Sequence, residues 1–295
     1  MYYEKLLNEQ KNIGLTRVIS FTSGKGGVGK TNSLINIGLA LVNEGRRVLI
    51  LDADLGLANV DILLGLTPKY TLEDLLYNQK NIEDIIVESE NGLSVIPAGS
   101  GVLSLLNLDA NKKSLIISEV ERIAKDYDYL LIDTGAGISD DVLFFNTVAM
   151  EVVCVINSEP TSLTDTYSLI KVLSQRGEKD FSILVNNVKN ETEAKNAYKK
   201  LFMAVEKFLR VKLKYVGFIP SDPIVNEAIF EQKAFVDMYP SSEVSRKVVS
   251  LAKNMDADFF DFRVKGGIQF FFKELLEQGK YGASLDGSYG SDFSF

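Results

Sequence analysis

Short, continuously apolar runs alternate with segments of helical periodicity along most of this 295-residue chain. Seven of the runs are rich in β-branched and aromatic residues, and they predict strands over 17–22, 46–52, 93–98, 127–133, 151–157, 181–187 and 214–220. Runs without polar alternation are typical of strands that are covered on both faces. Amphipathic stripes such as Leu34, Ile37 and Leu41 lie between them. The alternation predicts an α/β fold: a doubly wound, mostly parallel sheet flanked by helices.

A glycine-rich stretch follows the first predicted strand, at the carboxyl edge where such sheets bind ligands. It reads SGKGGVGKTN over residues 23–32 and fits the pattern G-x-x-x-x-G-K-[ST]. Glycines let backbone N–H groups turn toward phosphate oxygens, and the positive end of the next helix faces the same oxygens. We expect Lys30 to reach the β- and γ-phosphates and Thr31 to bind Mg²⁺. The predicted nucleotide loop comprises Gly24, Lys25, Gly26, Gly27, Val28, Gly29, Lys30, Thr31 and Asn32.

Aspartates follow two other predicted strands. Asp52, Asp54 and Asp61 come at or after the end of the second strand, in LDADLGLANVD. Carboxylates beside a phosphate loop can hold Mg²⁺ or orient the attacking water. Asp133 ends the apolar run YDYLLID, where a buried carboxylate is costly unless it meets a cation or hydrogen-bond donors. We expect Asp52 and Asp133 beside the metal, whereas Asp61 is equally consistent with a helix cap or a surface position.

The stretch KGGVGKT has a second, early lysine and resembles the deviant Walker A motif of the MinD/ParA family of ATPases. The resemblance implies a P-loop fold, ATP and Mg²⁺ as cofactors, and slow ATP hydrolysis stimulated by a partner or by lipid. In that family the early lysine reaches the partner's ATP across a homodimer, which implies this role for Lys25; a solvated lysine is the alternative. Asp54 matches the family's catalytic aspartate, so Asp54, Lys25 and Lys30 are the implied catalytic residues.

Two further segments resemble the adenine side of this family. Asn186 follows the apolar run ILV, and Pro220 and Asp222 stand in IPSDP. The resemblance implies that they recognise the base, although an ordinary turn explains either segment.

Additional motifs narrow the resemblance to the FlhG branch, which sets flagellar number and placement in bacteria. They are LDADLGLANVDILLGL, IPAGSG, IDTGAGIS, EPTSLTDTYSLIKVL and GFIPSDPIVNEAI. Implied partners are an FlhF-like GTPase and flagellar switch proteins. The stretch that activates FlhF in many members is represented here only by Glu9 and Gln10.

The segment GGIQFFFKELLEQ near the end has an apolar stripe at helical spacing. The stripe consists of Ile268, Phe271, Phe272, Leu275 and Leu276. The resemblance implies a membrane-targeting helix, and the alternative is a helix packed on its own domain. The predicted organisation is therefore an N-terminal extension (1–16), an ATPase domain (17–262), this amphipathic helix (263–278) and a flexible tail (279–295).

Composition excludes several classes of function. The chain has no histidine and one cysteine, Cys154, which we expect to be a buried structural thiol. An iron–sulfur carrier with the same loop would need more cysteines. The net charge of −8 gives no support for specific nucleic-acid binding by a ParA-type partition ATPase, although a local basic patch stays possible. We expect a cytoplasmic protein that associates peripherally with the inner face of the cytoplasmic membrane. A nucleotide-gated adaptor with little turnover is the other alternative.

Overall fold

The computed structural model describes residues 16–54, 59–98, 110–178 and 180–257. The predicted terminal helix and tail, and the predicted extension apart from Thr16, lie outside these residues. The described strands form one sheet in the order β3-β4-β2-β5-β1-β6-β7-β8, in which β3 and β4 are antiparallel and every other pair is parallel. The strands are β1 (Arg17–Ser23), β2 (Val48–Ala53), β3 (Val87–Glu88), β4 (Ser94–Ile96), β5 (Tyr129–Ala136), β6 (Glu151–Ile156), β7 (Asp180–Val188) and β8 (Lys212–Pro220).

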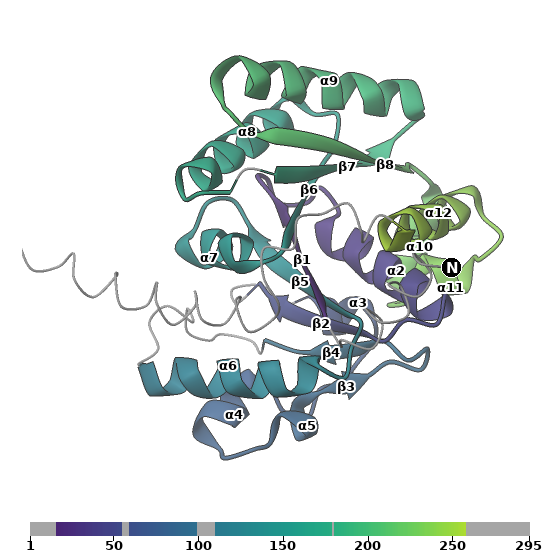
Figure 1. Cartoon of the computed structure of the whole chain (residues 1–295). Helices are drawn as coiled ribbons and strands as arrows, with labels where there is room; N and C mark the ends of the chain where they lie inside the picture. Colours follow the sequence, from purple (N-terminus) through teal and green to yellow (C-terminus); the bar gives the residue numbers. More distant parts are fainter. Residues whose placement is uncertain (1–15, 55–58, 99–109, 179, 258–295) are drawn as a thin grey trace, which may run out of the picture.

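Helices cover both faces of this sheet (Figure 1). They are α2 (Lys30–Asn43), α3 (Val60–Leu63), α4 (Leu72–Tyr77), α5 (Ile82–Ile85), α6 (Ala110–Ala124), α7 (Asp140–Val148), α8 (Pro160–Gln175), α9 (Glu191–Phe208), α10 (Pro223–Phe230), α11 (Phe235–Met238) and α12 (Glu243–Ala257). The start of helix α10 follows from local chemistry. Asp222 caps α10 by accepting a hydrogen bond from the Ile224 N–H at 3.1 Å, and Pro223 supplies the fixed φ of the first turn.

Adjacent side chains of each central strand enter different cores. Ile19 and Leu131 pack in the core beneath α2, α10, α11 and α12, whereas Val18 and Leu130 pack beneath α4, α5, α6 and α7. A third core joins α7, α8 and α9 to β6 and β7 and contains Cys154, which is fully buried as predicted. Since both faces are covered, these strands need no polar alternation. None of the helices in the described ranges is long and apolar enough to cross a bilayer.

The predicted α/β fold with a mostly parallel sheet is confirmed. Each of the seven predicted strands overlaps an observed strand. The two-residue strand β3 was not predicted, because it is too short to carry a sequence pattern. Strand β5 continues past its predicted end at Asp133, since Thr134 still pairs with Ala53 and Ala136 with Ser23.

A buried polar cluster ties the amino ends of the central strands to the end of α12. Arg17 and Glu151 are 2% and 7% exposed, and Arg17 Nη2 donates to Glu151 Oε2 at 2.8 Å. Arg17 also donates to the carbonyl oxygen of Met255. The hydroxyl of Tyr129 donates to Asp256 Oδ1 at 2.5 Å. These contacts fix where α12 ends, on the edge of the sheet opposite the carboxyl ends.

We expect Glu151→Ala to lower the free energy of unfolding by about 3–5 kcal/mol, because it leaves the Arg17 charge buried without the Glu151 carboxylate that neutralises it. Urea denaturation measures the change. Glu191→Ala is the matched control, since Glu191 forms an exposed pair with Lys195, and we expect it to cost less than about 1 kcal/mol. Equal losses in the two variants would contradict this account of the cluster.

Candidate functional site

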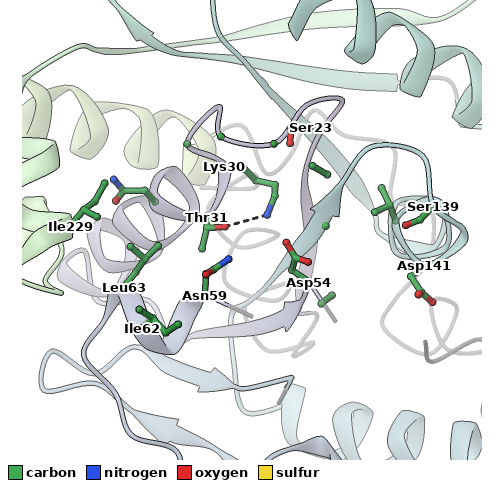
Figure 2. A pocket seen from close by; sticks show the side chains of 18 residues that line it. Ser23, Lys30, Thr31, Asp54, Asn59, Ile62, Leu63, Ser139, Asp141 and Ile229 are labelled. Carbon is green, nitrogen blue, oxygen red and sulfur yellow. Dashed lines mark hydrogen bonds between the residues drawn. The ribbon is translucent and has the colours of Figure 1, made fainter. Parts of the chain in front are cut away.

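A cavity of about 660 Å³ opens at the carboxyl ends of the central strands, a size typical of small-molecule sites. Its wall is formed by the loop after β1, the start of α2, the ends of β2 and β5, and residues of α3, α7 and α10. Figure 2 shows Lys30, Thr31 and Asp54 in the middle of this cavity, with Ile229 at one end and Asp141 at the other.

The predicted glycine loop forms the turn between β1 and α2. Gly29 is the N-cap of α2 with φ 85°, a left-handed conformation that favours glycine. Gly26, Gly27 and Gly29 line the cavity, whereas Val28 is only 3% exposed and anchors the loop in the core. The start of α2 therefore faces the cavity and presents its positive end there.

Gly24 does not line the cavity but lies against the backbone of α8. A Cβ atom built on it would lie 2.2 Å from Asp165 C and 2.2 Å from Thr166 N. Both neighbours are backbone atoms, which cannot move aside as a flexible side chain would. Glycine at this position therefore lets the loop pack directly on α8.

The ammonium group of Lys30 and the carboxylate of Asp133 form a buried ion pair. Lys30 Nζ lies 2.5 Å from Asp133 Oδ1, and the Thr31 hydroxyl donates to Asp133 Oδ2 at 2.7 Å. The two charged side chains are 7% and 1% exposed. Burial raises the pKa of Asp133, and the attraction of Lys30 opposes that rise. The sequence predicts that Asp133 meets a cation or hydrogen-bond donors, and here it meets both.

Asp52 is a second buried carboxylate next to this pair. Its oxygens accept hydrogen bonds from the N–H groups of Asp54 at 3.1 Å, Asn59 at 3.1 Å and Val60 at 3.3 Å. Burial and the neighbouring charge of Asp133 nevertheless raise the pKa of Asp52 to about 7. Two carboxylates and one ammonium leave a surplus of negative charge, which a further cation would stabilise.

Asp54 lines the cavity, and its Oδ1 lies 3.4 Å from the position that a Cβ on Gly135 would take. It is thus placed between the end of β2 and the last residues of β5. Asp61 is not in the cavity wall; its side chain accepts a hydrogen bond from the N–H of Ile62 at 2.8 Å in the first turn of α3. The N-cap of α3 is Asn59, so the predicted helix-cap alternative for Asp61 is wrong and the surface alternative describes it.

Lys25 is directed away from the cavity. Its Nζ lies 2.6 Å from Glu159 Oε2 and 3.0 Å from Thr161 Oγ1, at the first turn of α8. The Lys25 side chain is 39% exposed, against 7% for Lys30. Hydrogen bonding to Lys25 lowers the pKa of Glu159. The two lysines of the loop therefore have separate partners, one at the surface and one in the interior.

The three residues predicted on the adenine side do not line the cavity. The Asn186 amide donates to the carbonyl oxygen of Val28 at 2.8 Å and supports the loop from behind. Asp222 caps α10, and Pro220 is the last residue of β8. Their role in base recognition stays a prediction.

The sequence did not reveal several residues that complete this site. Ile62 and Ile229 come from α3 and α10, which are far apart in the chain and meet only in the fold. Asn36 is fully buried; its amide donates to Asn32 Oδ1 at 2.7 Å, and its Oδ1 accepts from the Val236 N–H at 3.0 Å. This chain of hydrogen bonds links the cavity wall to α11, and no short sequence pattern marks it.

Comparisons with known proteins agree with this geometry. A family model described as an AAA domain matches residues 16–184. The antiactivator FleN of Pseudomonas aeruginosa is 40% identical to this chain over 91% of the chain and 96% of FleN. The flagellum site-determining protein YlxH of Helicobacter pylori is 31% identical over 90% of the chain and 92% of YlxH. The chain belongs to the MinD/ParA family of P-loop ATPases.

A solved structure of the same family also matches this MinD/ParA ATPase, over nearly the whole length of the solved chain. The septum site-determining protein MinD of Pyrococcus horikoshii, complexed with Mg-ADP, is 28% identical with a TM-score of 0.68, and the match covers 84% of this chain and 99% of that one. The predicted resemblance to FlhG-like members is confirmed by FleN and YlxH. The roles predicted for individual site residues stay predictions.

We expect Gly24→Ala to destabilise this MinD/ParA ATPase by about 1–3 kcal/mol, because the added methyl group forces the loop away from α8. Gly26→Ala is the control: a Cβ there meets nothing within 4 Å, and we expect a change within about 0.5 kcal/mol. Chemical denaturation of both variants measures the difference. A Gly24 variant as stable as the Gly26 variant would show that the loop has room to move.

Proposed function

We propose that this chain is an ATP-dependent switch that controls the number or placement of flagella. The likeness to YlxH, a flagellum site-determining protein, over 90% of the chain carries the flagellar assignment. The likeness to the antiactivator FleN supports a regulatory role. The two lysines of the loop, with their different partners, support a switch that responds to nucleotide.

The proposed ligand is ATP with Mg²⁺. The loop residues Gly26, Gly27 and Gly29 and the first turn of α2 line the cavity and offer N–H groups to the phosphates, and Lys30 offers the cation. Thr31, Asp52 and Asp133 present the hydroxyl and carboxylate oxygens that Mg²⁺ prefers, either directly or through water. When bound, Mg²⁺ would neutralise charge that develops on the phosphates. The surplus negative charge of Asp52 and Asp133 fits such an ion.

Hydrolysis requires a water oxygen to attack the γ-phosphorus while the bond to the oxygen that bridges the β- and γ-phosphates breaks, so that ADP leaves. Asp54 is the proposed residue that orients this water, because its carboxylate lines the same cavity as Lys30 and Thr31 but lies outside the phosphate loop. Lys30 would stabilise the charge on the departing phosphate oxygens. Gly135, near the end of β5, and Gly137, just after it, would let this segment follow the presence or loss of the γ-phosphate.

Lys25 is proposed to act on the ATP of a second copy of the chain. In the single chain it pairs with Glu159 at the surface, and an exposed pair of this kind contributes only about 0–1 kcal/mol. Exchanging Glu159 for a triphosphate therefore costs little and gains contact with a higher charge. Nucleotide binding and dimer formation would become one event.

The dimer is proposed to bind the inner face of the cytoplasmic membrane through the apolar stripe of residues 268–276. Two weak helices in one dimer would bind more tightly than either alone. An FlhF-like GTPase and flagellar switch proteins are the proposed partners, and partner or lipid contact is the proposed stimulus of slow hydrolysis.

We expect Asp54→Ala to abolish turnover while leaving ATP binding and dimer formation intact, because Asp54 lies outside the loop that grips the phosphates. Phosphate release under saturating Mg-ATP measures turnover, and a fluorescent nucleotide measures binding. Asp61→Ala, a surface carboxylate from the same segment, is the control and should keep wild-type turnover. Normal turnover in the Asp54 variant would remove that residue from the mechanism.

We expect Lys25→Ala, placed in the Asp54→Ala background so that ATP persists, to stay monomeric in ATP while its monomers still bind ADP. Removing one partner of a buried charged contact at an interface costs about 2–5 kcal/mol, which is sufficient to dissociate a weak dimer. Sedimentation velocity measures the oligomeric state. Glu159→Ala in the same background removes the surface pair but keeps Lys25, and it should still dimerise. A Lys25 variant that dimerises with ATP would make Lys25 an ordinary loop residue.

A further inference from the structure

The turn from α9 to β8 carries a concentration of positive charge that the proposed function does not use. Residues 207–214 read KFLRVKLK, with four basic residues and no acidic one, in a chain whose net charge is −8. Helix α9 lies at the rim of the molecule beside β8 (Figure 1). We call the exposed side chains of Met203, Lys207, Phe208, Arg210 and Lys212 the basic corner.

Large apolar side chains are exposed among these cations. Phe208 is 65% exposed and Met203 is 59% exposed. Lys207 Nζ lies 5.0 Å from the centroid of the Phe208 ring. Lys207, Arg210 and Lys212 are all exposed, and none of them forms an ion pair within the described part of the chain. Positive charge together with exposed aromatic and thioether groups is typical of surfaces that bind anionic lipid.

A simpler explanation covers part of this surface. Strand β8 is an edge strand, and lysines on such a strand discourage pairing with another sheet. That explanation suits Lys212. It does not account for Lys207, Phe208 and Arg210, which precede the strand and cannot guard its hydrogen-bonding edge.

The position of the basic corner favours a membrane as its partner. The register pairs Asp180 with Lys212, so β8 begins at the amino edge of the sheet, opposite the cavity. Helix α12 ends at the same edge, where Arg17 at the start of β1 binds the Met255 carbonyl. Two strands lie between β1 and β8 in the sheet. At the usual strand spacing, the first residue of β1 and the first residue of β8 are therefore about 14 Å apart. The proposed membrane segment therefore leaves the domain from the edge that carries the basic corner.

We propose that the basic corner is a second membrane contact, which binds the anionic headgroups of the bilayer while Phe208 and Met203 enter the boundary between headgroups and acyl chains. This inference rests on the membrane binding stated under the proposed function. It assigns the domain an orientation, with the amino edge of the sheet toward lipid and the nucleotide cavity away from it. Each Lys or Arg near an anionic surface adds a comparable increment of affinity, so several weak contacts act together with the terminal segment.

The test measures co-sedimentation of the full-length chain with vesicles rich in phosphatidylglycerol and with vesicles of phosphatidylcholine, in Mg-ATP. The variant Lys207→Glu/Arg210→Glu/Lys212→Glu should bind anionic vesicles at least about tenfold more weakly than the wild type. Its turnover without vesicles should equal that of the wild type. Phe208→Ser should weaken binding to a smaller degree. Wild-type binding should fall as salt rises, because the attraction between exposed charges is screened.

The control variant is Lys195→Glu/Lys199→Glu/Lys200→Glu, which makes the same charge change on exposed residues of α9 nearer the cavity edge. It should keep wild-type affinity for anionic vesicles. Equal losses in both triple variants would overturn the proposed orientation, and no loss in the basic-corner variant would overturn the contact itself. A wild-type shift of duplex DNA that only the basic-corner variant loses, with vesicle binding unchanged, would reassign the corner to nucleic acid.

A full-length variant of the terminal stripe, Phe271→Glu/Phe272→Glu, separates this inference from the proposed function. If that variant loses binding and the basic-corner variant does not, the terminal segment alone binds lipid and the inference fails. If the basic-corner variant loses binding and the terminal variant does not, the inference holds and the role proposed for the terminal segment fails. If the wild type binds neither kind of vesicle, both fail.

Discussion

The buried ion pair between Lys30 and Asp133 is the contact on which the site depends. It joins the first turn of α2 to β5, and Thr31 completes the hydrogen bonding of the carboxylate. Such a pair is tolerable in a low-dielectric interior only when its geometry is good and its remaining oxygens are satisfied. The pair therefore links three structural features. The loop between β1 and α2 must be tight, β1 and β5 must be parallel neighbours, and α2 must begin at the edge of the sheet where Asp133 of β5 lies.

The same pair explains why this site suits an anion and a metal ion together. Asp52 lies beside Asp133, and burial together with the neighbouring charge of Asp133 raises the pKa of Asp52 to about 7. A triphosphate alone would compete with those carboxylates for Lys30. A divalent cation that arrives with the triphosphate supplies the missing positive charge, which is the physical reason for proposing Mg-ATP rather than a free nucleotide.

The carboxyl edge and the amino edge of the sheet have different roles. At the carboxyl edge, glycines and strand ends leave N–H groups, carboxylates and a cavity open to a ligand. At the amino edge, Arg17 and Glu151 close the core and hold the end of α12. The exposed Lys25–Glu159 pair and the buried Lys30–Asp133 pair show how burial alone separates two lysines of one loop: the first is easily exchanged, and the second is part of the framework.

The sequence by itself determined the fold class, the positions of seven strands along the chain and the identity of the nucleotide loop. It could do so because each of these signals is contained in a few adjacent residues. A parallel strand buried on both faces is a short apolar run, and the nucleotide loop is a short pattern of glycine, lysine and threonine. It also identified Asp52, Asp54 and Asp133, since each follows or ends an apolar run. Only the tertiary structure decided which lysine faces Asp133, that Glu159 holds Lys25, and that Ile62 and Ile229 form one wall. Those contacts join residues more than a hundred positions apart, and their energies depend on burial, which is a property of the folded chain and not of any short stretch of it.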